Sequence, residues 1–187
     1  MNSPDQTTER TKRRKARPAA RGFTLIEILV VIGIMGIFLV VSYPSILNTM
    51  AARNLENTTR QIQTFLQQTK LQAVSTKIVH RVRFFRVEGS YWAYDMERLQ
   101  VDGTWIKAGS APRKTISDRL NVTIAFPAVG ADHVAVFSPL GTFPQFAINQ
   151  NSIVLQSPKL DRPGQMDERV LSIFLGGSIQ YSKRKSA

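Results

Sequence analysis

The chain has 187 residues, a formal net charge of +12 and no cysteine. The absence of cysteine excludes disulfides, thiol nucleophiles and thiolate metal sites, although it says nothing about the cellular compartment. The surplus of Lys and Arg favours contact with nucleic acid, acidic lipid headgroups or acidic protein partners, and a solvated basic surface is the plainer alternative.

The first 22 residues form a polar and basic segment. Seven Lys and Arg side chains outweigh Asp5 and Glu9 and give this segment a net charge of +5. A basic flank beside an apolar run is held on the cytoplasmic side of a membrane, so we expect the amino terminus to stay inside while the rest crosses. Residues 42–46, which follow the run, contain no Ala-x-Ala site, so a removable secretory signal is not indicated.

The apolar run from Phe23 to Val41 contains one acid, Glu27. Its length is close to the roughly 20 residues that span a bilayer. An acid inside such a run costs about 3 kcal/mol on insertion scales, so it is a functional hypothesis by default. The simpler alternative is a membrane anchor whose Glu27 lies near the interface and reaches water.

Residues 21–27, with the sequence Arg-Gly-Phe-Thr-Leu-Ile-Glu, resemble the class III leader of type IV pilins and type II secretion pseudopilins. The resemblance implies that a prepilin peptidase cleaves on the cytoplasmic side after Gly22, and that Phe23 becomes the N-methylated amino terminus. It also implies that Glu27 serves subunit assembly and that Pro44 kinks the helix. The implied partners are other pilins or pseudopilins in a filament, an inner-membrane assembly platform and membrane lipid.

The role of Glu27 in such a filament follows from charge burial. Cleavage after Gly22 creates a positive amine on Phe23 beside lipid, and methylation keeps that charge. When helices stack with an axial stagger, Glu27 of one subunit meets the amine of its neighbour. The two burial costs then offset each other only in the assembled state, which favours assembly over free monomers.

Residues 44–79 are predicted to continue the helix into a globular domain. Apolar and small side chains recur at intervals of three or four, which is the spacing of one helix face. They are Leu55, Thr59, Ile62, Leu66, Thr69 and Ala73, with Phe65 and Val74 widening the stripe. We interpret the stripe as core contact with a C-terminal sheet. Pro44 removes one backbone donor and is expected to bend the helix where it leaves the membrane.

From about His80 onward the pattern changes to short β segments. The expected strands are 82–87, 91–96, 99–101, 104–106, 121–126, 133–138, 145–148, 152–156, 169–175 and 178–182. Asp102-Gly103 and Gly176-Gly177 each separate two of these strands and predict β-hairpins. We therefore expect an α+β fold in which a long N-terminal helix packs on an antiparallel C-terminal β-sheet domain.

The expected domain organisation has four parts. A cleaved cytoplasmic leader (1–22) is followed by a transmembrane and assembly helix (23–43), an amphipathic helix (44–79) and a β-rich globular domain (80–187). The stretch 137–142, Phe-Ser-Pro-Leu-Gly-Thr, with the strands that follow it, resembles the C-terminal region of the minor pseudopilin H (GspH) of type II secretion and of FimT-like minor pilins.

Catalytic and metal sites have little support in the sequence. His80 and His133 both fall inside expected strands and are interpreted as ordinary surface or core histidines. Asp161, Asp167 and Glu168 occupy an acidic loop, and such a loop binds calcium in major pseudopilins, but their spacing matches no EF-hand template. We expect a solvated loop, no metal, no cofactor and no enzymatic activity.

The C-terminal cluster Lys183-Arg184-Lys185 is the best candidate for contact with DNA or another phosphate. Arg81, Arg83 and Arg86 form a second basic group. In FimT-like pilins a Gly-Arg motif near the C terminus is implicated in DNA capture. Here Ser178 follows Gly177, so that motif is broken and only the later basic cluster remains.

Two classes of function stay open. The first is a minor pseudopilin, a structural subunit of a type II secretion pseudopilus or of a related type IV pilus. The second is a FimT-like minor pilin that binds DNA for uptake through its basic C-terminal surface. Either one is expected in the bacterial inner membrane as a single-pass protein with a cytoplasmic N terminus and a periplasmic globular domain.

Overall fold

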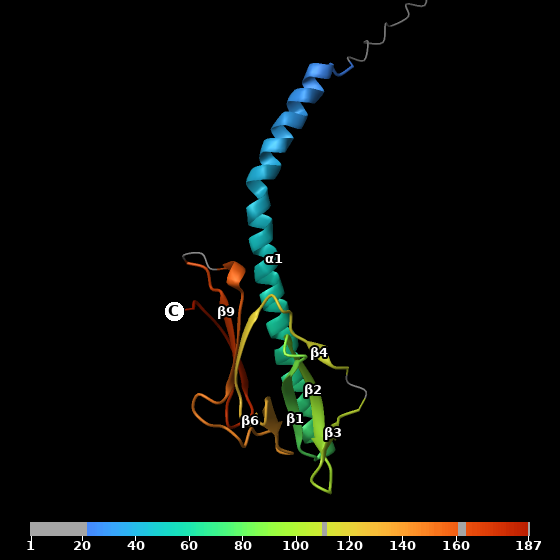
Figure 1. The fold of residues 1–187 in the computed structure, drawn as a ribbon, viewed down its shortest axis with the longest axis vertical. Helices are drawn as coiled ribbons and strands as arrows, with labels where there is room; N and C mark the ends of the chain where they lie inside the picture. The colour runs from blue at the N-terminus through green and yellow to red at the C-terminus, as the bar shows by residue number, and fades with distance from the viewer. Residues whose placement is uncertain (1–21, 110–111, 161–163, 187) are drawn as a thin grey trace, which may run out of the picture. The chain divides into compact units, whose positions relative to one another are not determined.

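The computed structural model describes residues 22–109, 112–160 and 164–186. The chain divides into two compact units, Met1–Ser42 and Tyr43–Ala187. The first unit contributes the start of a long helix, and the second holds the rest of that helix and all strands of the described residues (Figure 1).

Helix α1 runs from Leu25 to Thr76. It begins after Thr24, whose hydroxyl oxygen accepts a hydrogen bond from the Glu27 backbone N–H at 3.3 Å, as an N-capping residue does. It ends where Lys77 takes a positive φ of 58°, a left-handed conformation that terminates a helix. By length and composition, no single helix among the described residues qualifies to cross a membrane. Leu25–Val40 and Ser45–Thr76 meet the requirement together, as a bent pair.

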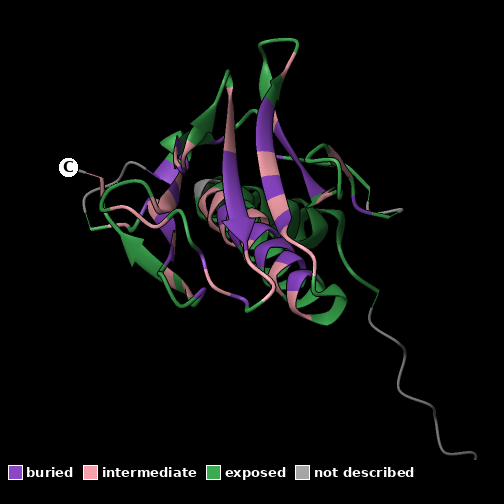
Figure 2. Ribbon diagram, turned by 90° about the horizontal axis from the view of Figure 1, so that it is seen from below, coloured by how far each residue is buried: buried purple, intermediate pink, exposed green. Residues whose placement is uncertain are grey.

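The predicted apolar stripe of α1 is confirmed in the second unit. Leu55, Ile62, Leu66 and Ala73 are fully buried. The two threonines of the stripe, Thr59 and Thr69, are equally buried, and each hydroxyl donates to the carbonyl four residues earlier, at 2.7 and 2.9 Å. Because these hydroxyls are satisfied within the helix, they do not disturb an apolar interface. Figure 2 shows the buried residues of α1 on the side that faces the strands.

The first sheet is antiparallel and contains six strands. Its strands follow the order β3-β2-β1-β7-β6, and β4 pairs with β2 beside β3. The strands are β1 (His80–Val87), β2 (Tyr91–Leu99), β3 (Trp105–Lys107), β4 (Lys114–Thr115), β6 (Ala128–Val129) and β7 (Asp132–Phe137).

The second sheet is antiparallel, with four strands in the order β10-β9-β8-β5. It consists of β5 (Asn121–Ala125), β8 (Ser152–Gln156), β9 (Glu168–Ile173) and β10 (Ile179–Arg184), with the short 3-10 turn η1 (Pro158–Leu160) after β8. Figure 1 shows β8, β9 and β10 in orange and red beside α1.

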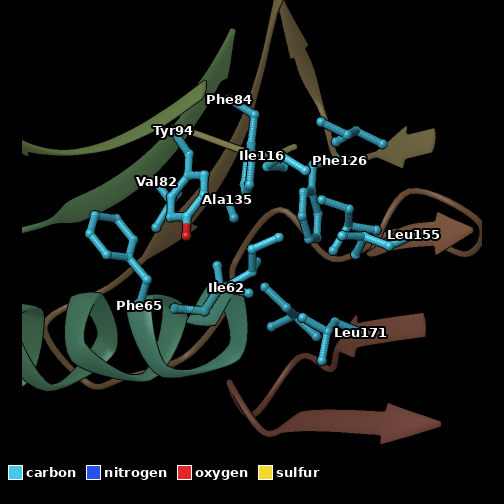
Figure 3. Close-up of a cluster of buried hydrophobic side chains, with 14 of the residues drawn as sticks. Ile62, Phe65, Val82, Phe84, Tyr94, Ile116, Phe126, Ala135, Leu155 and Leu171 are labelled. Atoms are coloured by element: carbon cyan, nitrogen blue, oxygen red, sulfur yellow. The ribbon is translucent and has the colours of Figure 1, made fainter. Parts of the chain in front are cut away.

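Side chains from α1 and from both sheets meet in one hydrophobic core (Figure 3). Phe65 of the helix packs edge-on against Tyr94 of β2, with ring centroids 5.0 Å apart. Leu155 and Leu171 reach the same cluster from β8 and β9. The expected α+β fold, a long N-terminal helix packed on an antiparallel β-sheet domain, is therefore confirmed.

Both glycine hairpins are confirmed. Asp102-Gly103 lies in the turn between β2 and β3, and Gly176-Gly177 in the turn between β9 and β10. The first turn is wider than predicted, because β2 ends at Leu99 and the expected strand 99–101 is mostly turn.

The expected strand 145–148 is wrong. Residues 144–150 form consecutive turns, closed by backbone hydrogen bonds from Phe146 to Phe143 and from Gln150 to Ala147. Pro144 lacks a backbone donor, and Asn149 has a positive φ of 65°. Both features favour turns over a strand, although Phe146 and Ile148 alternate as they would in a strand.

Candidate functional site

The N-terminal motif lies at the open end of α1. Gly22 and Phe23 precede the helix, and Phe23 is 79% exposed. Glu27 is the only acid in the first helical turn. A carboxylate at this position interacts favourably with the partial positive charge of the helix N terminus. The rest of the predicted leader, residues 1–21, lies outside the described residues.

The role of Thr24 was not recognised from the sequence. The spacing of Thr24 and Glu27 is that of a capping box, in which Thr caps the helix and Glu or Gln follows three residues later. The hydrogen bond from the Glu27 N–H to the Thr24 hydroxyl supplies half of this arrangement. The pattern Ser/Thr-x-x-Glu was visible in residues 24–27, so the helix start was predictable.

The apolar side chains of α1 between residues 25 and 40 are exposed in the first unit. Leu25, Ile26 and Leu39 are 82%, 66% and 71% exposed. A helix that is apolar on all sides is stable when lipid or protein surrounds it. This observation agrees with a membrane or assembly helix, while the kink predicted at Pro44 stays a prediction.

Glu56 organises the contact between α1 and the C-terminal hairpin. Its carboxylate accepts hydrogen bonds from the Tyr181 hydroxyl and from Arg169 Nε at 3.1 Å, and Lys183 Nζ lies 3.3 Å from it. Burial would raise the pKa of this carboxyl, but the hydrogen bonds from Tyr181, Arg169 and Lys183 lower the pKa to about 2. Glu56 is therefore an ionised anchor, and the predicted phosphate contact Lys183 is one of its partners.

The other two residues of the predicted phosphate cluster differ from each other. Arg184 Nε pairs with Glu168 at 2.5 Å across the β9–β10 ladder. Lys185 is exposed and makes no ion pair with a described residue. The structure thus brings two of the three cations onto carboxylates, and Lys185 alone projects without such a partner.

The second basic group lies on the first sheet and is also surrounded by acids. Arg81 pairs with Glu97 at 2.6 Å and lies over the Trp105 ring. Arg83 lies 3.4 Å from Glu97 and within 4.0 Å of two further carboxylates, those of Asp95 and Asp132. Arg86 stacks on Trp92, 4.9 Å from the ring centroid. Carboxylates thus compensate the charges of Arg81 and Arg83, whereas Arg86 pairs with no carboxylate among the described residues.

The remaining polar candidates have structural partners. His80 Nδ1 and His133 Nδ1 lie 2.9 and 3.0 Å from backbone carbonyls, of Ile78 and Phe126 respectively. No group of three metal-binding side chains gathers among the residues that the structure describes.

The acidic loop contributes one well-bonded carboxylate, that of Asp167. It accepts hydrogen bonds from Gln156 Nε2 at 2.9 Å and from the Ser186 backbone N–H at 2.8 Å. Burial would raise the pKa of Asp167, but these hydrogen bonds together hold that pKa well below its usual range. The carboxylate therefore holds the C-terminal end of the chain against the second sheet. Asp161 lies outside the described residues.

Comparison with known proteins identifies the N-terminal segment. Residues 17–43 match the family model described as the prokaryotic N-terminal methylation motif. No curated protein matches the chain. The match confirms the resemblance of this segment to prepilin N termini, while the roles predicted for Gly22, Phe23 and Glu27 stay predictions.

Two kinds of solved structure are similar to this chain. The type IV minor pilin FimU of Pseudomonas aeruginosa has 18% identity and a TM-score of 0.46, with 70% of this chain and 90% of that chain covered. The minor pseudopilin EpsH from the type 2 secretion system of Vibrio cholerae has 14% identity and a TM-score of 0.46, covering 70% of this chain and 97% of that chain.

Proposed function

We propose that the protein is a minor pseudopilin, a structural subunit of a type II secretion pseudopilus or of a related type IV pilus. The observation that carries the proposal is the methylation motif at residues 17–43, joined to one long helix. That helix exposes apolar side chains before Val41 and buries an apolar stripe that starts at Leu55. One element thus combines a surface for lipid or neighbouring helices with the attachment of a globular domain.

The proposed order of processing and assembly steps follows from this arrangement. A prepilin peptidase removes residues 1–22, and the new amine on Phe23 is methylated. The chain stays in the inner membrane through residues 23–43, with its globular domain on the periplasmic side. An assembly platform then inserts it among other pilins or pseudopilins, where Glu27 compensates the amine of a neighbouring subunit.

Leader processing is the first test of this proposal. The full chain is coexpressed with a prepilin peptidase, and the membrane fraction is examined by mass spectrometry. We expect loss of residues 1–22 and one added methyl group on Phe23. Gly22→Val removes the glycine at the cleavage point and should leave the leader intact. An uncleaved wild-type chain, or a Gly22→Val chain that is cleaved normally, would overturn the assignment.

DNA capture is the weaker candidate function. It depends on Lys183, Arg184 and Lys185, and the first two are already paired with Glu56 and Glu168. Opening these pairs for a phosphate exchanges one compensated charge for another, so little binding free energy is gained. A structural role in a filament requires no such exchange.

A further inference from the structure

A cavity of about 310 Å³ lies where α1 enters the globular unit. Leu47, Met50 and Asn54 line it from the helix, Arg119 lines it from the loop before β5, and Lys159 lines it from η1. Among the described residues that line this cavity there is no Asp or Glu. The cavity therefore combines two cations with apolar side chains, among them Leu47 and Met50.

An exposed apolar stripe leads along α1 to this cavity. Tyr43, Ile46, Leu47 and Met50 have the spacing i, i+3, i+4 and i+7, so they share one helix face. They are 63%, 56%, 47% and 61% exposed within the second unit. This face of α1 is thus apolar and uncovered over the two turns from Tyr43 to Met50. Tyrosine at the start of such a stripe is typical of a membrane interface.

The position of the cavity along the chain limits what it meets. Leu47 lies six residues after Val41, the end of the apolar run, which corresponds to about 9 Å of helix. In the proposed anchoring, the cations that line the cavity therefore belong to a part of the chain next to the membrane. An anionic membrane surface attracts Lys and Arg within about one Debye length. The turn η1, which carries Lys159, lies beside α1 in Figure 1.

We propose that this cavity binds the phosphate of an anionic phospholipid headgroup. Arg119 and Lys159 contact the phosphate, and Leu47 and Met50 contact the upper part of the acyl chains. The proposal rests on the membrane anchoring in the proposed function and adds a lipid preference to it. It also gives a role to part of the surplus positive charge, which the C-terminal cluster does not explain.

The test uses the full chain purified in detergent and exchanged with equal amounts of phosphatidylglycerol and phosphatidylcholine that have identical acyl chains. Native mass spectrometry measures the ratio of the two bound lipids. We expect the wild-type protein to prefer phosphatidylglycerol. Arg119→Gln/Lys159→Gln should reduce this preference at least about fivefold, as expected for lost cation contacts near an anionic surface. An unchanged ratio in the double variant would overturn the proposal.

The chain offers a matched control. Lys77 and Arg98 line another cavity, of about 570 Å³, beyond the opposite end of α1. Lys77→Gln/Arg98→Gln also removes two positive charges, one Lys and one Arg, and should retain the lipid preference. An equal loss in this control would overturn the site in favour of a general charge effect. Matching thermal unfolding of the variants establishes that both fold.

Two further measurements separate other occupants. Inorganic phosphate without lipid tests a soluble ligand. A thermal shift at millimolar phosphate that depends on Arg119 and Lys159, without a lipid preference, would overturn the lipid assignment. Reduced cross-linking of the double variant to filament partners with an unchanged lipid ratio would overturn it in favour of a subunit contact. Neither assay depends on leader cleavage, so failure here leaves the proposed function standing.

Discussion

Two separable effects are predicted for Glu27. Thr24 and Glu27 have the spacing of a capping box, which favours a helix start, and we propose that the Glu27 charge compensates the amine of a neighbouring subunit. A change of charge without a change of shape distinguishes these effects. Gln is suited to this purpose, since a capping box accepts Glu or Gln at this position.

Glu27→Gln is therefore predicted to preserve membrane insertion and leader cleavage while it lowers incorporation into filaments. Glu27→Val should do the same and should also weaken the first helical turn by about 0.5 kcal/mol. Cross-linking of membrane fractions followed by quantification of the complexes measures incorporation, and Glu27→Asp serves as the charged control. Equal incorporation of the Gln variant would show that the carboxylate is only tolerated at the interface.

Glu56 gives a prediction about pH and stability. Its folded pKa of about 2 lies below its ordinary value of 4.5, so the folded state favours the ionised form. The stabilisation is therefore complete above about pH 5 and is lost as the pH falls through 4.5 toward 2. Glu56→Gln should lower the free energy of unfolding by about 2 kcal/mol at pH 7, because charged hydrogen bonds are lost and Arg169 is left unpaired.

The measurement is urea unfolding of the full chain in detergent at pH 7 and pH 3. The fluorescence of Trp92 and Trp105, the two tryptophans of the sequence, reports on the globular domain. The difference between wild type and Glu56→Gln should shrink at pH 3. Glu88→Gln, at an exposed acid in the β1–β2 turn, is the control and should change little. A difference that is constant with pH would contradict the role of the Glu56 carboxylate.

Among the elements, the β9–β10 turn is held against the loop after β7 by a close backbone approach. A Cβ atom on Gly177 would lie 1.9 Å from the Gly141 carbonyl oxygen, and the φ of Gly177 is +68°. Lys70 Nζ of α1 donates to the Gly177 carbonyl at 2.9 Å. The glycine thus lets three separate segments meet.

Gly177→Ala is predicted to destabilise the domain by at least about 2 kcal/mol, because it adds both a backbone clash and a strained φ. Gly176→Ala is the matched control, since a Cβ there meets nothing within 4 Å. Thermal unfolding of the two variants should show a large loss for the first and a small change for the second. Equal stability would mean that the turn moves to accommodate the methyl group.

How far the elements could be predicted depended on whether their signals were local. The helix stripe was predicted correctly because its period of three to four is carried by consecutive turns, and Thr59 and Thr69 satisfy their own hydroxyls. The strand expected at 145–148 failed because alternation also occurs in a pair of turns. Lys183 and Arg184 pair with Glu56 and Glu168, which are distant from them in sequence. The sequence alone therefore did not reveal that these two cations are already paired and less available to a phosphate.

For the whole molecule, the distribution of charge matters more than its total. The predicted leader carries +5 of the formal +12, so +7 remains after cleavage. Within the described residues, six Lys and Arg side chains pair with carboxylates, among them Arg81, Arg83 and Lys183. Net charge alone therefore does not indicate which cations are available to a polyanion.

The last prediction concerns DNA. The full chain in detergent should bind duplex DNA without sequence preference, with a dissociation constant of about 1 µM or weaker at physiological salt. Neutralising Lys183, Arg184 and Lys185 together should flatten the salt dependence by about one unit, because only Lys185 lacks an acidic partner among the described residues. Gel-shift titrations at two salt concentrations measure this slope, with Lys77→Gln/Arg98→Gln as a control for general charge.

A loss of about three units would show that all three cations engage phosphates and would favour DNA capture. Absence of binding even at low salt would leave the filament subunit as the only proposed function.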